Sequence, residues 1–441
     1  MFLTRRFFLK STGALAMYMG VSHFDLLGLG GGQRVLARPV TKGKTLVVLF
    51  LRGGADGLNL VIPYGDENYT KIRSSIAVPG PAASVDQYQK VIDIDGFFGL
   101  HPRLGALAPL FSSGAMCAAH AVGYDKNTRS HFEEQDTWET GIVGNTLNSD
   151  GWLNRHLMTS EGWGPIRAVA VGDALPRILH GKGGAFAVRG LEDLVVPSAK
   201  SNGASADQVA AALECAYCTP RPQKAASGDK SSAMDLLAQN AKVTLDGVAQ
   251  LRVIARQKYE PVQPYPRTGL GNRLMQVARL IKADIGLEVA EVDLGGWDTH
   301  QNQGAANGAL GNLASELGDA LAAFNTDMAE RMNDTLVITI TDFGRTAHEN
   351  GTNGTDHGWA NCMFVMGGGV SAAAALRDDK QKKVVTKWPG LAEDQLHQKR
   401  DLLHTTDFRD VLAEVVRVHL GNPNLEKVLP NHQFKPVGLV A

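Results

Sequence analysis

Two short apolar segments, each followed at once by polar residues, constrain the fold of this chain most strongly. Leu287–Leu294 leads into Gly-Gly-Trp-Asp-Thr-His at 295–300, and Thr335–Ile340 leads into Thr-Asp-Phe-Gly-Arg at 341–345. Both segments are short and partly β-branched, which is typical of buried strands. The Ala- and Leu-rich segment between them, Gly304–Met332, has charges spaced along it and predicts a helix. A strand, a helix and a strand in this order predict a parallel α/β sheet.

Side chains that can bind metal follow these predicted strands. Asp298 and His300 follow the first strand, Asp342 follows the second, and His357 lies in a Thr-Asp-His-Gly segment at 355–358. Functional residues of parallel sheets gather beyond the carboxyl ends of the strands, so we expect these four side chains to meet at one edge. Carboxylates together with imidazoles suit zinc, manganese or iron. The sequence therefore predicts a metal site at this edge.

A third segment of the same kind lies near the start of the mature chain. Thr45–Leu51 is an apolar run that leads into a glycine-rich turn containing Asp56. Its place after a predicted strand makes Asp56 a candidate oxygen ligand, whereas an isolated Ala-Asp-Gly is typical of a turn whose carboxylate binds local amides. Arg52 is a candidate clamp for phosphate or sulfate, or an ion-pair partner of Asp56.

A fourth predicted strand, Ala115–Gly123, leads into a helix start that contains Ser130. Ser130 and Glu133 form the S-x-x-E pattern of a capping box, which predicts Ser130 at the N-terminus of a helix. Two roles remain open for its hydroxyl group. It caps the helix, or it is a nucleophile whose pKa is lowered by the helix N-terminus and a nearby metal. His131 is a candidate ligand, general base or partner of Glu134.

The first residues have the pattern of an export signal. Thr4–Lys10 contains two adjacent arginines followed by apolar residues, 15–29 is apolar and glycine-rich, and Val35-Leu36-Ala37 is a small-residue cleavage site. We expect residues 1–37 to be a twin-arginine signal peptide and the twin-arginine translocase to be a partner during export. The mature chain is then periplasmic or extracellular. An uncleaved N-terminal anchor is the alternative.

Composition and cysteine usage exclude several classes of protein. The 44 basic and 45 acidic side chains nearly cancel, which argues against a nucleic-acid partner. We see no second apolar run long enough to span a bilayer, so no stable membrane span is expected in the mature chain. For Cys215 and Cys218, a C-x-x-C pair, a local disulfide is the favoured interpretation over a redox or metal role. Cys117 and Cys362 lie in apolar segments and are expected to be buried.

Several further elements are expected from apolar periodicity and capping patterns. Helices are predicted over 104–111, 231–256 and 272–284, and a strand over 166–172. The segment His404–Asp410 is expected to open another helix, with Thr405 or Thr406 as its cap and with structural rather than catalytic carboxylates.

Six motifs follow one another along the mature chain. They are LRGGADGLN, RSHFEEQD, GGWDTH, TDFGR, TDHGW and HTTDFRD. Through them, essentially the whole mature sequence resembles the exported bacterial family catalogued as domain of unknown function 1501. That family is in turn similar to the alkaline phosphatase and sulfatase superfamily. The resemblance implies an alkaline phosphatase-like, three-layer α/β/α fold with a mainly parallel central sheet. It implies one domain over 38–441, with a helical or loop insertion around 198–285.

The resemblance also implies roles for individual residues. Asp56, Asp298, His300, Asp342 and His357 match ligands of one or two divalent ions, which would be Zn, Mn, Fe or Ca. Two departures concern these ligands. Asp298 and His300 are closer in sequence than the superfamily usually has them, and Phe343 stands where a histidine of the second ion is expected. His131, His348 or Asp356 would replace that nitrogen ligand, or the second ion or the whole site is absent.

The function implied by the resemblance is hydrolysis of phosphate or sulfate esters by an exported, metal-dependent protein. Ser130 matches the nucleophile, and the substrate would be a small oxyanion ester. Arg52, Arg129 or Arg345 would neutralise its oxygens, although Arg345 pairing with Asp342 as a support is an alternative. A non-catalytic exported binding or scaffold protein with a degenerate metal site is the competing hypothesis.

Overall fold

The structure of the protein is a computed structural model that describes residues 43–144, 149–162, 164, 166–191, 246–370 and 383–441. The predicted signal peptide at 1–37 and the pair Cys215 and Cys218 lie outside these residues. The predicted insertion around 198–285 lies partly outside them. Cys117 and Cys362 are buried, which confirms that prediction.

A nine-stranded sheet forms the centre of the described structure. Its order is β11-β5-β10-β9-β1-β8-β6-β7, with β12 beside β5. The strands are β1 Thr45–Leu51, β5 Met116–Gly123, β6 Ala168–Val171, β7 Phe186–Val188, β8 Val289–Leu294, β9 Thr335–Thr341, β10 Asn361–Gly367, β11 Val384–Val385 and β12 Thr406–Asp407. A small second sheet consists of β2 Val61–Ile62, β4 Gly99–Leu100 and β3 Ile92–Asp93.

The α-helices of the described residues are α2 Gly57–Leu60, α3 Asn68–Ile72, α4 Ala108–Ser113, α5 His131–Thr140, α6 Trp152–Thr159, α9 Gly269–Lys282, α10 Ala309–Met328, α12 Phe408–Glu414 and α13 Leu425–Val428. Short 3-10 helices include Pro102–Leu107 before α4 and Ala329–Asp334 after α10, and Val415–His419 forms a π-helical turn after α12. Residues 246–256 are also helical. Within the described residues, none of the helices combines the length and the apolar character that a bilayer crossing needs.

β1 lies in the middle of the sheet, with β8 and β9 parallel to it on either side. All of its residues are buried, because side chains on both faces pack into hydrophobic core. One core cluster contains Val47, Leu49 and Leu51, and another contains Leu46, Val48 and Phe50. A strand buried on both faces has no polar alternation, which is why its sequence is a continuous apolar run.

β10 is the exception among the parallel pairings of this sheet. It pairs antiparallel with β5 and β9, whereas the other described pairings are parallel. Because β10 runs in the opposite direction, its first residue, Asn361, lies beside Val122 near the carboxyl end of β5. The segment that precedes β10, including His357, therefore reaches the same edge of the sheet as the segments that follow β1, β8 and β9.

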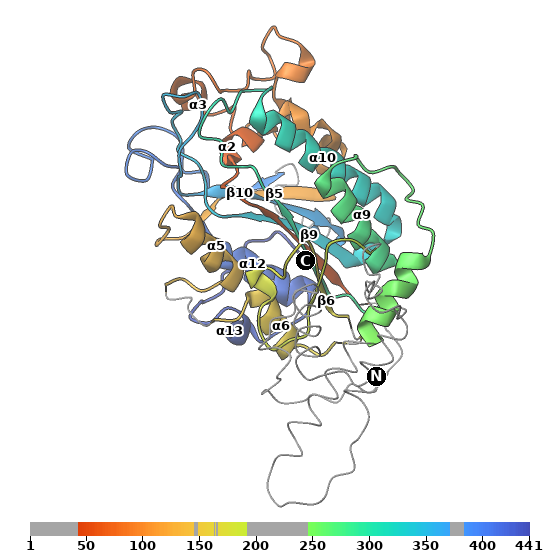
Figure 1. Cartoon of the computed structure of the whole chain (residues 1–441). Helices are drawn as coiled ribbons and strands as arrows, with labels where there is room; N and C mark the ends of the chain where they lie inside the picture. The colour runs from red at the N-terminus through yellow and green to blue at the C-terminus, as the bar shows by residue number, and fades with distance from the viewer. Residues whose placement is uncertain (1–42, 145–148, 163, 165, 192–245, 371–382) are drawn as a thin grey trace, which may run out of the picture.

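Helices cover both faces of the sheet and give three layers (Figure 1). α9 and α10 pack on one face, where Leu274 and Phe324 join the core cluster of Val47. α5, α6, α12 and α13 lie on the other face, where Trp138 and Val411 join the cluster of Leu46. The predicted α/β class with a mainly parallel central sheet is confirmed.

The start of α12 differs from the prediction. Thr406 is part of β12 and pairs with Val122, so neither Thr405 nor Thr406 caps the helix. The cap is Asp407, whose carboxylate accepts a hydrogen bond from the backbone N–H of Arg409 at 2.9 Å. Because the short strand extends through Asp407, the helix begins later than its sequence pattern predicts, and the carboxylate satisfies a free N–H of the first turn.

Candidate metal centre

Two glycines after β1 allow the connections at the carboxyl edge to approach each other closely. Gly53 and Gly54 have positive φ angles of 119° and 72°. A Cβ atom on Gly53 would lie 2.6 Å from the backbone nitrogen of Asp298, and one on Gly54 would lie 2.6 Å from the ring of Phe343. Both the backbone conformation and the space therefore require glycine.

Four side chains surround one carboxylate oxygen at this edge, Oδ1 of Asp298. Three of them are histidines whose Nε2 atoms lie 3.0 Å (His300), 3.1 Å (His357) and 3.5 Å (His131) away. The fourth is Arg345, whose guanidinium group lies 2.5 Å from the same oxygen. The side chain of Asp298 is 45% exposed, so the group is open to solvent on one side.

Each of the three imidazole rings is held through its other nitrogen, Nδ1, by an oxygen acceptor. The pairs are His131 with Asp342 Oδ2 at 2.5 Å, His300 with Asp356 Oδ1 at 2.9 Å, and His357 with the carbonyl oxygen of Arg129 at 2.8 Å. A carbonyl or carboxylate oxygen accepts hydrogen bonds, so a proton on Nδ1 of each ring would satisfy these contacts. In the neutral ring, Nε2 is then a bare lone pair, which is the form that binds a metal.

The arrangement of these donors fits a single metal ion. The candidate ligand atoms of His131, Asp298 and His357 all lie within 4.8 Å of one another. His300 Nε2 lies 3.0 Å from His357 Nε2, and two bare lone pairs at that distance repel unless a cation or proton lies beside them. Ligands of a tetrahedral zinc ion with bonds of about 2.0–2.1 Å are about 3.3 Å apart, close to the 3.0–3.5 Å that separate Asp298 Oδ1 from the three Nε2 atoms.

The electrostatic environment favours the ligand forms of Asp298 and His357. Burial alone would raise the pKa of Asp298, but the hydrogen bond and the charge of Arg345 lower it below its ordinary value. Burial lowers the pKa of His357, and the charge of Arg345 lowers it further, against opposing hydrogen bonds to Arg129 and Asp298. The carboxylate therefore stays ionised and the imidazole stays neutral at neutral pH.

Arg345 is a buried support of the centre. Its side chain is inaccessible to solvent and donates hydrogen bonds to the carbonyl oxygens of Gly53, Gly54, Trp297 and Thr355 as well as to Asp298. It therefore joins three connections at the edge of the sheet. The prediction placed its supporting ion pair on Asp342, and the structure has it on Asp298.

Asp342 and Asp56 lie beside the group rather than within it. Asp342 is fully buried and accepts hydrogen bonds from His131, Gln135 and the N–H of Gly53. Asp56, also buried, forms an ion pair with Arg73 at 2.6 Å, and not with Arg52. Both carboxylates thus have partners in the chain, and their predicted metal ligation stays a prediction.

Arg52 and Arg129, the other predicted clamps, are held by acidic side chains. Arg52 contacts Asp293 at 2.5 Å and Glu139 at 3.1 Å, and these carboxylates raise its pKa although burial opposes the charge. Arg129 contacts Asp401 at 2.5 Å. These contacts therefore do not support the prediction that Arg52 or Arg129 binds substrate oxygens.

Ser130 stands at the start of α5, as the sequence predicts, but its side chain makes no capping hydrogen bond. It is half-buried and lies between Arg129, whose carbonyl group holds His357, and His131. Glu134, weighed as a partner of His131, instead accepts hydrogen bonds from Thr128 and Tyr124. The hydroxyl group of Ser130 is thus not used as the capping-box pattern implies.

His131 is a nitrogen donor of this group, whereas the sequence left its role open between ligand, general base and partner of Glu134. Its ring lies against Phe343, with the centroids 4.7 Å apart, and Phe343 also packs against His357 at 4.5 Å. Phe343 is therefore an apolar wall beside both imidazoles, whose own ring centroids lie 4.4 Å apart. His131 supplies a nitrogen from another segment, whereas His348 is exposed and Asp356 holds His300. The sequence signal for His131 was its place one residue after the predicted cap.

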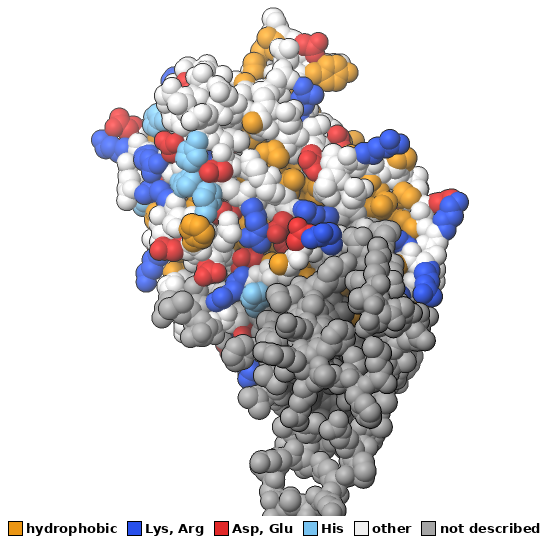
Figure 2. Space-filling model, in the orientation of Figure 1, with side chains coloured by type: hydrophobic (Ala, Val, Ile, Leu, Met, Phe, Trp, Pro, Cys, Tyr) orange, Lys and Arg blue, Asp and Glu red, His pale blue; other side chains and the backbone are white. Residues whose placement is uncertain are grey.

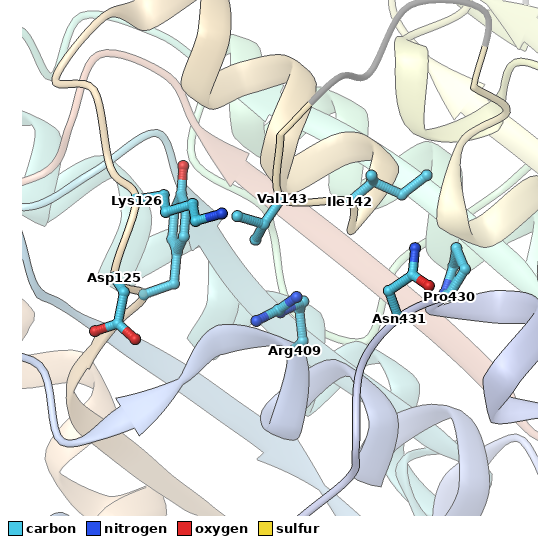
Figure 3. A pocket seen from close by; sticks show the side chains of 8 residues that line it. Asp125, Lys126, Ile142, Val143, Arg409, Pro430 and Asn431 are labelled. Carbon is cyan, nitrogen blue, oxygen red and sulfur yellow. The ribbon is translucent and has the colours of Figure 1, made fainter.

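Histidine side chains gather on one face of the molecule, between α5 and the region of α2 and α3 (Figure 2). A separate cavity of about 290 Å³ is lined in part by residues of the β5–α5 connection (Figure 3). Tyr124, Lys126, Ile142, Arg409 and Asn431 are among its lining residues, and none of the metal-binding candidates is. The candidate centre is therefore an open surface site distinct from this cavity.

The fold and the donor group define an α/β protein with a candidate metal centre at the carboxyl edge of its sheet. The chain belongs to the family described as "Protein of unknown function (DUF1501)", whose model matches residues 43–421. The resemblance seen in the sequence motifs is thus confirmed at the level of the family. No protein with a curated description matches the chain.

The chain is similar to several solved structures, of which two are described. One is PsFucS1 sulfatase from Pseudoalteromonas sp., with 12% identity over 74% of this chain and 62% of that chain and a TM-score of 0.25. The other is alkaline phosphatase from the Antarctic bacterium TAB5, with 15% identity over 75% of this chain and 93% of that chain and a TM-score of 0.26. The chain spans less than two thirds of the sulfatase, and similarity this low assigns no residue and no activity.

Proposed function

We propose that the chain is an exported, metal-dependent hydrolase of small phosphate or sulfate esters. In this proposal Asp298, His131, His300 and His357 hold one divalent ion. The observation that supports it is the convergence of three imidazole Nε2 atoms on one carboxylate oxygen, with every Nδ1 engaged elsewhere. Nitrogen-rich sets of this kind suit zinc, manganese or iron, whereas calcium prefers oxygen ligands.

The chain's own residues prepare this site for an ester. Arg345 fixes the carboxylate of Asp298, and Asp342 fixes the ring of His131. When bound, a divalent ion would act as a Lewis acid toward a phosphoryl or sulfuryl oxygen and would favour ionisation of a nearby hydroxyl group. Because the three predicted arginine clamps have partners in the chain, the N-terminus of α5 is the further positive feature beside the ester oxygens.

Ser130 is the proposed nucleophile. It precedes the ten-residue helix α5, whose positive end stabilises an alkoxide, and its side chain is free of a capping hydrogen bond. Its Oγ would bond to phosphorus or sulfur as the bond to the leaving oxygen breaks, and water would then cleave the covalent ester. The proton lost by the hydroxyl group would pass to solvent, to which the site is open.

Replacing Ser130 with alanine is expected to lower kcat by about 10³-fold or more, because the nucleophile is lost while the metal donors remain. The measurement is turnover of aryl phosphates and aryl sulfates by the zinc-, manganese- or iron-loaded mature chain, with metal content from elemental mass spectrometry. Ser113→Ala, at an exposed serine near the end of α4, is the matched control. Equal turnover by Ser130→Ala and the wild type would exclude Ser130 as the nucleophile.

A binding protein without turnover is the second candidate function. The engagement of Arg52, Arg129 and Arg345 and the pairing of Asp56 with Arg73 favour it, because they leave little charge free for an ester. Stoichiometric metal without turnover of any tested ester, and no difference between Ser130→Ala and wild type, would support this candidate.

Export is proposed from the leader at 1–37, with the twin-arginine translocase as a transient partner. Replacing Arg5 and Arg6 together with lysine is expected to leave the chain in the cytoplasmic fraction, since the translocase recognises the arginine pair. Cell fractionation checks this expectation, with Lys10→Arg as a control. Unchanged export of the double variant would contradict the proposed route.

A further inference from the structure

A buried amide, Gln303, lies beneath the candidate centre and joins its two main connections. Its Oε1 accepts hydrogen bonds from the hydroxyl groups of Thr299 at 2.7 Å and Thr355 at 2.8 Å. Thr299 lies between Asp298 and His300 in the connection after β8, and Thr355 lies two residues before His357 in the connection between β9 and β10. One oxygen atom therefore links both ligand-bearing segments.

The orientation of this amide is fixed by a carboxylate on its other side. Nε2 of Gln303 donates a hydrogen bond to Asp56 Oδ2 at 2.6 Å. A carboxylate only accepts hydrogen bonds, so the NH₂ group must face Asp56 and the carbonyl oxygen must face the two hydroxyl groups. Gln303, Thr355 and Asp56 are almost completely inaccessible to solvent, so water does not compete for these bonds.

Arg73 anchors the same network to the segment after β9. Its guanidinium group binds Asp56 at 2.6 Å and donates to the carbonyl oxygens of Thr346 at 2.8 Å and Ala347 at 2.9 Å. Thr346 directly follows Arg345, which holds Asp298. The chain Arg73–Asp56–Gln303 therefore contacts the connections that follow β1, β8 and β9, which carry Asp298, His300 and His357.

We propose that Gln303 is a positioning residue that sets the separation of the two ligand-bearing connections. This inference rests on the proposed metal centre but not on ester hydrolysis. The side chain of Gln303 forms no hydrogen bond with Asp298, His131, His300 or His357, and it acts through Thr299 and Thr355. Metal donors must be held within about 0.5 Å of their productive geometry, so loosening this link changes both affinity and coordination. Loss of a partner beyond the ligands typically lowers metal affinity about 10–100-fold.

The test is a titration of the metal-free mature chain with Co²⁺. Calorimetry measures the affinity, and visible absorption reports the coordination of the bound ion. Gln303→Leu removes all three hydrogen bonds at similar volume. It is expected to bind Co²⁺ about 10–100-fold more weakly and to change the position or intensity of the absorption bands. Thr355→Val removes one of the bonds without changing shape and is expected to shift both readouts in the same direction by less.

Gln276→Leu is the matched control. Gln276 lies on α9 and is also a buried amide, and its Oε1 accepts a hydrogen bond from the N–H of Leu191 at 2.8 Å. Its Co²⁺ affinity and spectrum are expected to equal those of the wild type. A wild-type chain that binds neither Co²⁺ nor Zn²⁺ would overturn the metal centre itself.

If the wild type binds Co²⁺ and Gln303→Leu binds it with the same affinity and the same spectrum, the positioning role alone is overturned. If Gln303→Leu does not fold, the isosteric variants Thr299→Val and Thr355→Val decide by the same two readouts.

Discussion

Alanine in place of Asp298 is expected to abolish measurable metal binding and, with it, any metal-dependent turnover. Asp298 supplies the oxygen on which three histidine Nε2 atoms converge, at 3.0 to 3.5 Å. Four-ligand zinc sites bind with about 10–16 kcal/mol, so an equal share is about 3 kcal/mol per ligand, or roughly a hundredfold in affinity. The loss here is larger than that share, because the histidines would then face the unpaired charge of Arg345.

Elemental mass spectrometry and zinc titration of the purified mature chain measure this effect. Asp125→Ala is the control, because the side chain of Asp125 is 91% exposed and outside the donor group. Asp298→Asn keeps an oxygen acceptor for Arg345 and separates loss of the ligand charge from loss of the fold. Undiminished metal content in Asp298→Ala would mean that the ion binds elsewhere.

Replacing Arg73 with methionine is expected to lower the free energy of unfolding by about 3–5 kcal/mol. Arg73 and Asp56 are both almost fully buried and 2.6 Å apart, so the variant leaves a carboxylate without its countercharge. It also removes hydrogen bonds to Asn59, Thr346 and Ala347. A buried charge without a partner costs its full desolvation energy. Removing one partner of such a pair therefore destabilises the fold by more than the intact pair stabilises it.

Urea denaturation of the metal-free chain measures this loss without contribution from metal. Arg189→Met is the matched control, since Arg189 and its partner Asp173 are each 73% exposed, and such pairs contribute at most about 1 kcal/mol. Equal stability of Arg73→Met and Arg189→Met would show that the buried pair does not stabilise the fold.

Five strands of the central sheet, β1, β5, β6, β8 and β9, were predictable because each is a short, largely apolar run that is almost wholly buried. β1 and β9 have the predicted bounds to within one residue, and residues expected at the carboxyl edge of β8 and β9 lie there. The family followed from motifs in the same segments and is confirmed by the family match. These features depend on local pattern and on the general geometry of parallel sheets, which a sequence carries directly.

The choice of partners could not be predicted, because it depends on residues far apart in the chain. His131 and Asp342 are separated by 211 positions, and Arg345 and Asp298 by 47. No local sequence pattern predicts that Asp342 accepts a hydrogen bond from the ring of His131, or that Arg345 forms its ion pair with Asp298. Likewise, Arg73 lies in a segment without any motif, yet it binds the carboxylate that the sequence offers as a metal ligand.

The antiparallel strand β10 also fixes when the centre can form. His357 precedes β10, whereas Asp298 follows β8 and His131 follows β5, so the donors meet only after strands distant in sequence have paired. Contacts of such long sequence separation form slowly, and a nascent chain that ends before β10 lacks a closed donor set. An ion that binds only the completed set stabilises the native state by mass action. Metal uptake would then report that the sheet has closed around β10.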